Sequence, residues 1–412
     1  MAKEITCCRI CGTTTLAPIL SLGNQYLTGV FPRTRQQAIT CGPLELVKCD
    51  GGCGLVQLRH SYDSAEMYGE NYGYRSGLNQ SMVAHLRSKV AGLLGTTALA
   101  ATDLVLDIGS NDGTLLSFYP DTVTRVGMDP TVGKFLEHYR PGIETVADFF
   151  TAAAFRSRFG SRKAKIVTSI AMFYDLESPL SFVEQIASIL DDEGIWHFEQ
   201  SYLPTLLATN AYDTVCHEHL EYYCLKQVKW VLDRCGMKIV DVELNDVNGG
   251  SFAVTAAKAG AAIPENTAAL GRLLDAEERA GLSTPAPYEL FRRRVFDHRD
   301  ALLAQLDLLA RRGAKVLGYG ASTKGNVILQ FCGITPAQLP CIAEVNPDKF
   351  GCFTPGTGIP IVSEAVAHAL HPDYLLVLPW HFRRNLIERE KAFLDRGGGM
   401  IFPLPEIEII GR

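Results

Sequence analysis

The chain has 412 residues, of which 47% are hydrophobic and 20% charged, and its formal net charge is −6. This composition is that of a soluble globular protein large enough for two or three domains. The acidic balance argues against general nucleic-acid binding, which needs a basic face, and no apolar run approaches the roughly 18 residues of a membrane span. The N-terminus has no apolar signal core, so we expect a cytoplasmic protein without nucleic-acid or membrane partners.

Cysteines are crowded in residues 1–72, a turn-rich stretch with six of the twelve cysteines in its first 53 positions. The spacings C-x2-C and C-x3-C are typical of zinc ligands, and four thiolates close a tetrahedral site with no open position. Cys7 and Cys41 are rival ligands, and free or buried thiols are the alternative without a metal. We predict that a structural Zn²⁺ is held by Cys8, Cys11, Cys49 and Cys53.

The middle of the chain has the pattern of a doubly wound parallel sheet. Apolar residues at helical spacing predict a helix at 79–95, and strands then alternate with helices such as 179–190. Two further β-rich runs, 238–244 and 251–258, are joined by NDVNGG and predict an antiparallel hairpin that closes the sheet, as in class I methyltransferase folds. The predicted parallel strands are 104–109, 125–130, 165–170 and 195–200.

The last third begins with a mostly helical stretch, 264–312, and continues as a second α/β run. We interpret this run as a smaller, Rossmann-like sheet. Its predicted strands are 315–320, 341–346, 374–380 and 400–405. The predicted fold is therefore α/β in three domains: a zinc-binding domain at 1–72, a methyltransferase-type sheet at 73–260 and a Rossmann-like domain at 261–412.

A nucleotide-binding loop, DIGSNDG at 107–113, follows the first strand and precedes a predicted helix. Asp129 ends the next strand, 22 residues after Asp107, close to the spacing of about 20 for an acidic residue that binds ribose hydroxyls. Because the loop lacks the third glycine of a dinucleotide motif, it favours S-adenosylmethionine over NAD, with a plain βα turn as the alternative. The predicted cofactor-binding residues are Asp107, Gly109, Asn111, Gly113, Asp129, Pro130, Asp148 and Phe149.

Two histidines flank a glutamate at positions 217–219, after the fourth strand, where a doubly wound sheet places its ligand-facing loops. Neighbouring His and Glu side chains suit proton abstraction near neutral pH. A metal site on an extended backbone and a polar helix start with solvated histidines are the alternatives. The H-E-x-x-H spacing of a zinc protease is absent.

Several stretches together resemble the sugar C-methyltransferases of deoxysugar pathways: CRICG, CGLVQL, YGENYGYRSGLNQSM, DIGSNDG, MFYDLE, CHEHLEYY, NGGS, GYGASTKGN and PGTGIPI. The resemblance runs the length of the chain in the same domain order. It implies an N-terminal zinc domain, a middle adenosylmethionine domain and a C-terminal Rossmann-like domain, with the substrate between the last two. The implied substrates are nucleotide-linked, typically dTDP-linked, 4-keto-6-deoxy sugars that are methylated at C3.

The resemblance also implies residue roles. It maps the family's catalytic histidine and the glutamate before it onto His219 and Glu218, and an active-site tyrosine onto Tyr74. A tyrosine that some members place three residues before that histidine is Cys216 here. The residues that would take its place are His217, Tyr222 and Tyr223.

Carbon methylation next to a ketone needs a base, and we predict that His219 takes the C3 proton. The enolate left behind needs hydrogen-bond donors, for which the candidates are Tyr74, His217 and Tyr222. Glu218 would orient an imidazole or bind a sugar hydroxyl. Methyl transfer then depends on in-line positioning.

GYGASTKGN at 318–326 follows a strand and is predicted to open a helix that receives the diphosphate of the sugar nucleotide. It is not a Walker loop, and a purely structural turn is the alternative. The predicted substrate-binding residues are Tyr72, Tyr74, Asn248, Gly320, Ser322, Thr323 and Lys324.

Two other classes of function compete with methyl transfer. The first is an NAD-dependent nucleotide-sugar epimerase or dehydrogenase, although no convincing Tyr-x-x-x-Lys pair accompanies either α/β run. The second is a zinc-ribbon binding module fused to a degenerate methyltransferase. The intact DIGSNDG loop, Asp129 and the 217–219 segment favour an active enzyme.

Overall fold

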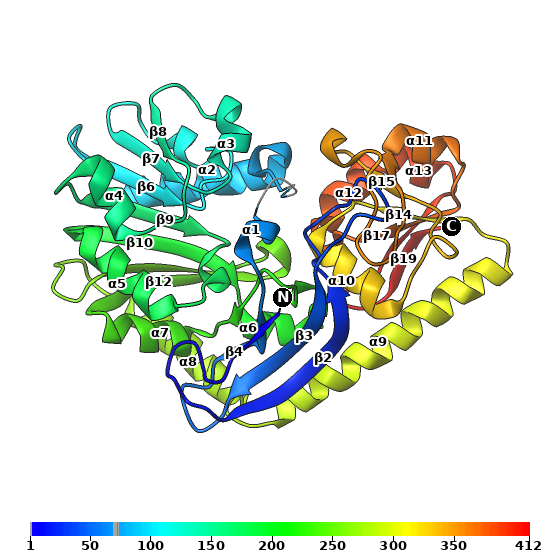
Figure 1. Cartoon of the computed structure of the whole chain (residues 1–412), viewed down its shortest axis with the longest axis horizontal. Coiled ribbons are helices and arrows are strands. Elements are labelled where there is room, and N and C mark those ends of the chain that lie inside the picture. The colour runs from blue at the N-terminus through cyan, green and yellow to red at the C-terminus, as the bar shows by residue number, and fades with distance from the viewer. Residues whose placement is uncertain (1, 69–71, 73) are drawn as a thin grey trace.

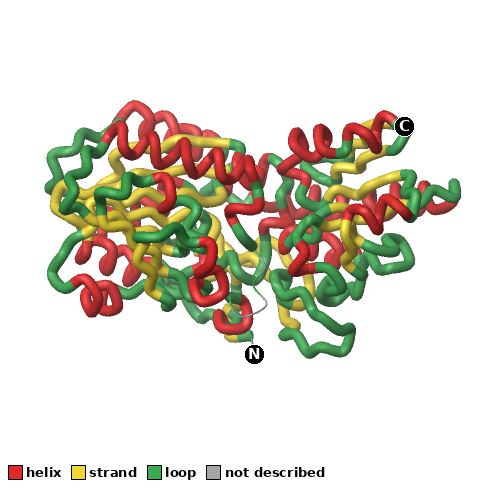
Figure 2. The backbone as a smooth tube through the Cα atoms, turned by 90° about the horizontal axis from the view of Figure 1, so that it is seen from above, coloured by secondary structure: helices red, strands yellow, loops and turns green. Residues whose placement is uncertain are grey.

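The computed structural model describes residues 2–68, 72 and 74–412. Two α/β halves lie side by side, each with strands between helices, and long N-terminal strands pass below and between them (Figures 1 and 2). The α/β class and the three-part order predicted from the sequence are confirmed. Within the described ranges, no helix is long and apolar enough to cross a membrane.

A seven-stranded sheet, in the order β12-β13-β10-β9-β6-β7-β8, forms the first half. Its first five strands along the chain are parallel, and β13 pairs antiparallel with both β10 and β12, so the predicted closing hairpin is confirmed. All five residues of β6 are buried, as expected for an inner parallel strand covered on both faces. The strands are β6 (Leu104–Ile108), β7 (Thr124–Met128), β8 (Ile143–Val146), β9 (Ala164–Ile170), β10 (Leu190–Ser201), β12 (Met237–Asn245) and β13 (Ser251–Lys258).

Helices cover both faces of this sheet (Figure 1). In α2 (Gln80–Thr96), the side chain of Asn79 caps the first turn by accepting from Ser81 N, and Met82, Leu86 and Val90 bury one face. The helix predicted directly after the nucleotide loop is only a short 3₁₀ turn, η2 (Leu116–Phe118). The other α-helices are α3 (Val132–Phe135), α4 (Ala152–Phe159), α5 (Pro179–Ile189), α6 (Leu203–Ala208) and α7 (Leu225–Arg234).

The N-terminal strands form a four-stranded sheet in the order β11-β4-β3-β2. Three of them come from the N-terminal region: β2 (Leu16–Tyr26), β3 (Cys41–Cys49) and β4 (Val56–Leu58). The fourth, β11 (Glu221–Tyr222), directly follows the 217–219 segment and pairs antiparallel with β4. This pairing ties the 217–219 segment to the cysteine-rich part of the chain. The small elements β1 (Lys3–Glu4), β5 (His60–Ser61) and α1 (Ser64–Met67) complete this part.

The second half has a six-stranded sheet in the order β16-β15-β14-β17-β18-β19. Five strands are parallel and β19 pairs antiparallel at the edge, which is a doubly wound order. The long helix α9 runs from the first half to the second (Figure 1). Helix α8 (Thr267–Arg279) still packs against α7 and β12 of the first half. The elements that follow are α9 (Ala286–Arg311), β14 (Val316–Tyr319), α10 (Thr323–Cys332), β15 (Ile342–Glu344), β16 (Ile361–Ser363), α11 (Glu364–Ala369), β17 (Tyr374–Val377), α12 (Arg383–Arg389), α13 (Lys391–Asp395), β18 (Gly399–Phe402) and β19 (Glu408–Gly411).

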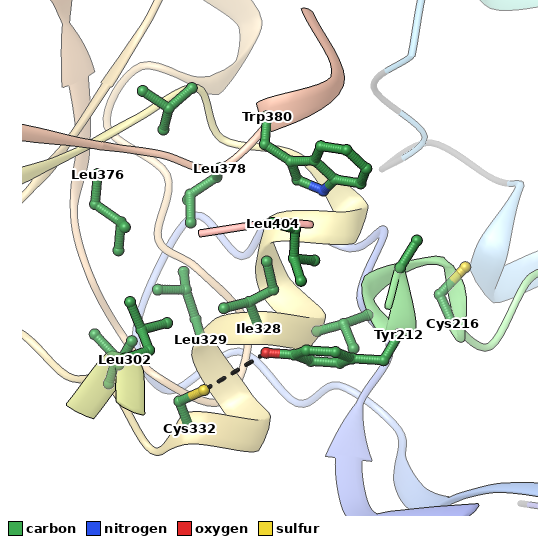
Figure 3. Packing of buried hydrophobic residues seen from close by; sticks show 14 of the residues in the cluster. Tyr212, Cys216, Leu302, Ile328, Leu329, Cys332, Leu376, Leu378, Trp380 and Leu404 are labelled. Atoms are coloured by element: carbon green, nitrogen blue, oxygen red, sulfur yellow. Dashed lines mark hydrogen bonds between the residues drawn. The ribbon is translucent and has the colours of Figure 1, made fainter. Parts of the chain in front are cut away.

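Apolar packing joins the three parts of the chain. The N-terminal region contributes to two large clusters, one shared with the second half and one with the seven-stranded sheet. Figure 3 shows Tyr212, just before the 217–219 segment, packed against Ile328 and Cys332 of α10, with its hydroxyl 3.8 Å from Cys332 Sγ. The loop that carries the 217–219 segment is therefore held by both other parts of the chain.

Candidate active site

The four predicted zinc ligands form a compact cluster. One ligand atom from each of Cys8, Cys11, Cys49 and Cys53 lies within 4.8 Å of all the others. The Cys8–Cys53 and Cys11–Cys49 Sγ atoms are 3.5 Å and 3.4 Å apart, near the separation of about 3.8 Å that follows from Zn–S bonds of about 2.3 Å in a tetrahedron. The hydrogen bond between Cys8 and Cys53 lowers the pKa of Cys8, which favours the thiolate that binds metal.

Local geometry explains why the second cysteine turn contains glycine. A side chain at Gly52 would place its Cβ 2.6 Å from Cys49 Sγ and 2.9 Å from Cys11 Sγ. Cys7 and Cys41, the rival ligands, are not members of the cluster that the described residues form. The residues present fit a structural zinc ion with four thiolate ligands and no open position.

A cavity of about 380 Å³ lies between the carboxyl ends of the two parallel sheets. The loops after β6, β7 and β9 line it from one side, and the loops after β14 and β17 line it from the other. This is the edge at which open α/β sheets bind ligands. The predicted site residues that line it are Tyr72, Tyr74, Asp107, Gly109, Asn111, Asp129, Pro130, Phe149, Glu218, His219, Asn248, Ser322, Thr323 and Lys324.

The nucleotide loop is organised by Asp129. Its carboxylate accepts hydrogen bonds from Asn111 N at 2.8 Å and from Thr131 N at 2.6 Å, which holds the loop after β6 against the end of β7. Asp107 accepts from Thr168 Oγ1 at 2.6 Å, and burial raises the pKa of its carboxyl to about 7. Gly109 has φ +72° in this loop, a conformation that favours glycine.

Three predicted glycine and aspartate positions do not line the cavity, and each has another role. Gly113, with φ +73°, and Gly320, with φ +80°, would each bring a Cβ into contact, with the Tyr139 ring at 2.6 Å and with Pro379 at 2.5 Å respectively. The side chain of Asp148 accepts from the backbone N of Phe149 at 2.8 Å. At these three positions the structure shows a role in local backbone packing.

His219 is held in one orientation. Its Nδ1 lies 2.8 Å from the carbonyl oxygen of Thr214. Because a carbonyl only accepts, Nδ1 must donate, and Nε2 keeps its lone pair. The ring packs against Tyr174, with centroids 4.2 Å apart. Burial, followed by the charge of Lys324, lowers the pKa of His219 to about 3, so the imidazole is neutral at pH 7.

Glu218 also lines the cavity, and the N-terminal region forms part of its surroundings. Thr28 Oγ1 donates to Glu218 Oε2 at 3.3 Å, and a Cβ at Gly29 would lie 2.3 Å from Oε1. Burial raises the pKa of this carboxyl. Glycine at position 29 is therefore needed for the close approach of the chain to Glu218.

The structure does not bring His217 and Tyr222 to the cavity, contrary to the roles predicted for them. His217 is fully buried, with its ring edge-on to Tyr62 at 4.6 Å. Burial lowers its pKa to about 4. The Tyr222 hydroxyl donates to the carbonyl of Thr214 at 3.3 Å. The physical reason is a turn: His219 N donates to the Cys216 carbonyl at 3.1 Å, and the chain reverses at residues 217–218, so His217 and His219 leave it in different directions.

The loop after β14 combines capping with a buried cation. Ser322 caps α10 by accepting from Gly325 N at 3.0 Å, so the predicted helix start is confirmed. Lys324 Nζ donates to the carbonyl of Asn248 at 2.7 Å, which links the second half of the chain to the β12–β13 hairpin. Asn248 adopts a left-handed conformation, with φ 55°, at the tip of that hairpin.

Four titratable residues of the cavity wall were not predicted: Tyr68, Tyr174, Asp175 and His381. Burial raises the pKa of Asp175 well above its ordinary value and lowers that of His381 well below it. Asp175 follows β9, and His381 follows β17. The rule that ligand-binding loops follow the carboxyl ends of parallel strands would have pointed to both.

Comparison with known proteins identifies the family. Three family models match the chain in order: "Putative zinc binding domain" at 8–68, "Methyltransferase domain" at 81–242 and "C-methyltransferase C-terminal domain" at 246–405. The C-methyltransferase NovU of Streptomyces niveus is 32% identical over 420 residues, covering 100% of this chain and 98% of NovU. The chain belongs to this C-methyltransferase family, as the sequence resemblance predicted. It is an adenosylmethionine-dependent methyltransferase with an N-terminal zinc-binding domain.

Solved structures resemble parts of the chain only distantly. The plantazolicin methyltransferase BpumL, in a complex with S-adenosylhomocysteine, has 10% identity and a TM-score of 0.35, covering 43% of this chain and 84% of its own. TnmH has 16% identity and a TM-score of 0.33, covering 43% and 56%. The family assignment therefore rests on the family models and on NovU.

Proposed function

We propose that the chain methylates C3 of a nucleotide-linked 4-keto-6-deoxy sugar through an enolate, with His219 as the base. The observation that carries this proposal is the Nδ1 contact with the Thr214 carbonyl, which leaves Nε2 unprotonated, with a free lone pair, on a ring that lines the cavity. The sugar class is supported by the sequence resemblance, and the diphosphate linkage by Ser322 and Thr323 at the start of α10 on the facing wall.

The residues around the cavity would have separate roles in binding the cofactor, positioning the sugar and removing the proton. Asp107, Gly109 and Asp129 would hold adenosylmethionine, which supplies an electrophilic methyl group on sulfur. Tyr72, Tyr74 and Asn248 would position the sugar, and Glu218 would bind one of its hydroxyls. His219 takes a proton from C3, and the closed surroundings keep its imidazole neutral until it does so.

The proposed domain division is 1–72, 73–260 and 261–412, with the substrate between the last two. A cytoplasmic location and a dTDP-linked substrate belong to the same proposal. The NAD-dependent alternative finds no support, because all three family models describe parts of a methyltransferase.

The direct test is mass spectrometry of products from a panel of nucleotide-linked sugars with adenosylmethionine. The panel should contain 4-keto-6-deoxy sugars on thymidine and on other nucleotides, together with the matching 4-hydroxy sugars. We expect one added methyl group on carbon, only in the keto sugars, because only a ketone makes the neighbouring hydrogen acidic. Methylation of the hydroxy sugars, or methylation on oxygen, would contradict the enolate.

A further inference from the structure

We propose that Lys324 is a catalytic residue that stabilises the enolate oxygen, rather than a ligand of the diphosphate. The proposal rests on the proposed function, because it concerns the ketone that is deprotonated there. Lys324 begins α10 in the second half of the chain, yet it lines the same cavity as His219 of the first half.

The ammonium group of Lys324 is held from the first half of the chain. Its Nζ donates to the Asn248 carbonyl at 2.7 Å, which uses one of its three protons and fixes where the group lies. The side chain cannot extend freely toward solvent from this position. An anchored ammonium with further protons to donate suits recognition of an oxygen atom at one defined point of the cavity.

A buried carboxylate supplies the opposite charge. Asp213 is completely buried, and its Oδ2 accepts from Trp380 Nε1 at 2.7 Å. Its Oδ1 has no hydrogen-bond partner in the part of the chain that the structure describes. Burial lowers the pKa of Lys324, while the charge of Asp213 raises it. Asp213 therefore opposes the effect of burial and favours the charged form of Lys324.

Lys324 lines the same cavity as the proposed base. Its charge adds to burial in lowering the pKa of both His219 and His381, which line that cavity too. In a ketone, the oxygen and the acidic hydrogen are carried by adjacent carbons. The base and the group that stabilises the oxygen must therefore face the same small region, and the pair His219 and Lys324 meets this requirement.

The other donors expected for the oxygen are poorly placed. His217 is buried against Tyr62, and the Tyr222 hydroxyl donates to the Thr214 carbonyl. Tyr74 lines the cavity but 46% of it is exposed. A partly buried, anchored cation offers a stronger interaction with a developing negative charge than an exposed phenol does.

The proposed step is the removal of one proton from C3. His219 Nε2 takes the C3 proton, and the electron pair of the broken C–H bond forms the C3–C4 double bond. The carbonyl π pair moves onto the C4 oxygen, and Lys324 Nζ donates a hydrogen bond to that oxygen without giving up its proton. The product of the step is an enolate with C3 as its nucleophilic carbon.

The test separates deprotonation from binding. The enzyme is incubated with the keto sugar nucleotide in deuterated water without adenosylmethionine, and C3 exchange is followed by NMR. Methylation kinetics are measured separately. For Lys324→Gln we expect exchange and kcat to fall by about 10²–10³-fold, as on removal of one oxyanion donor, with KM for the sugar nucleotide unchanged. Lys324→Arg, which keeps the charge, should retain more exchange than Lys324→Gln.

Control measurements distinguish a catalytic role of Lys324 from a role in binding the diphosphate. Lys315→Gln removes a lysine of the same half whose Nζ donates to the Leu370 carbonyl at 2.6 Å, outside the cavity, and it should exchange as the wild type does. Unchanged adenosylhomocysteine affinity shows that a variant is folded. A raised KM with unchanged kcat and exchange would overturn the inference in favour of a diphosphate ligand. Wild-type enzyme that neither exchanges nor methylates any keto sugar would overturn the proposed function itself.

Discussion

The cysteine cluster draws its four ligands from two short turns at 8–11 and 49–53, whereas the cavity draws its side chains from positions spread between Tyr68 and Phe382. On a turn, the spacing of two cysteines determines that both thiols face one point. On a longer loop, the direction of each side chain depends on where the backbone turns, so residue type and position leave open which one meets the ligand. The two regions therefore differ in how far sequence spacing predicts the membership of a site.

The largest effect is expected at the cluster. Cys11→Ser removes one of four thiolates, and we expect loss of the bound zinc and a large drop in stability, since structural zinc contributes about 10–16 kcal/mol in zinc-finger peptides. Metal analysis of freshly purified protein and thermal unfolding measure both effects. Cys41→Ser, at an exposed cysteine outside the cluster, should keep one zinc per chain. Equal zinc content in the two variants would contradict the assignment.

The next largest effect is expected at the base. His219→Asn keeps a polar side chain of similar reach but cannot accept a proton near neutral pH, and we expect about a 10²–10⁴-fold loss of methylation. C3 exchange in deuterated water should fall in parallel. Calorimetric affinity for adenosylhomocysteine should not change, because the Asp129 loop is held by its own hydrogen bonds. Retained exchange would move the base elsewhere in the cavity.

A smaller effect is expected for the cofactor. Asp129→Ala should weaken adenosylmethionine and adenosylhomocysteine equally, by about 1.5–3 kcal/mol for one charge-assisted hydrogen bond to the shared ribose. The variant also releases Asn111 N, so Asp129→Asn, which keeps an acceptor oxygen, should lose less. Asp121→Ala, at an exposed aspartate paired with Arg125, is the control. Unchanged calorimetric affinities for Asp129→Ala would place the ribose contact elsewhere.

The smallest effect on rate is expected at the neighbouring histidine. His217→Asn alters a ring buried against Tyr62, so methylation per folded molecule should stay near wild type. The change should appear instead as a lower unfolding temperature, within the range of about 0.5–3 kcal/mol usual for single substitutions. Comparing this variant with His219→Asn shows which of the two histidines on the loop takes part in catalysis. The reverse order of rate effects would exchange the two roles.

The sequence predicted regular structure and turns well. Most strands of the two large sheets, the closing hairpin, the start of α10 and the four cysteines follow from apolar runs, glycine turns and spacing. Strands β8, β16 and β19 were not predicted. The four residues of β8 are only partly buried and form no apolar run. The helix expected after DIGSNDG was wrong, because the chain makes only a 3₁₀ turn there.

At the cavity, the features that could not be predicted from the sequence depend on contacts between residues far apart in the chain. Fourteen predicted residues line it, but the different directions of His217 and His219 depend on a turn that leads into β11, a two-residue strand whose partner lies more than 150 residues earlier in the chain. The place of Gly29 beside Glu218 depends on the same long-range packing. No periodicity within a short window carries information of that kind.

The pairing of β11 with β4 has a consequence for recombination between relatives. Exchanging residues 8–68 alone would graft a foreign β4 onto the native Glu221–Tyr222 strand, two residues beyond His219. Any mismatch of register there would rotate the loop that carries the base. A functional chimera must therefore exchange the Glu221–Tyr222 strand together with the metal-binding segment. The two segments that must be exchanged together are separate stretches of the gene.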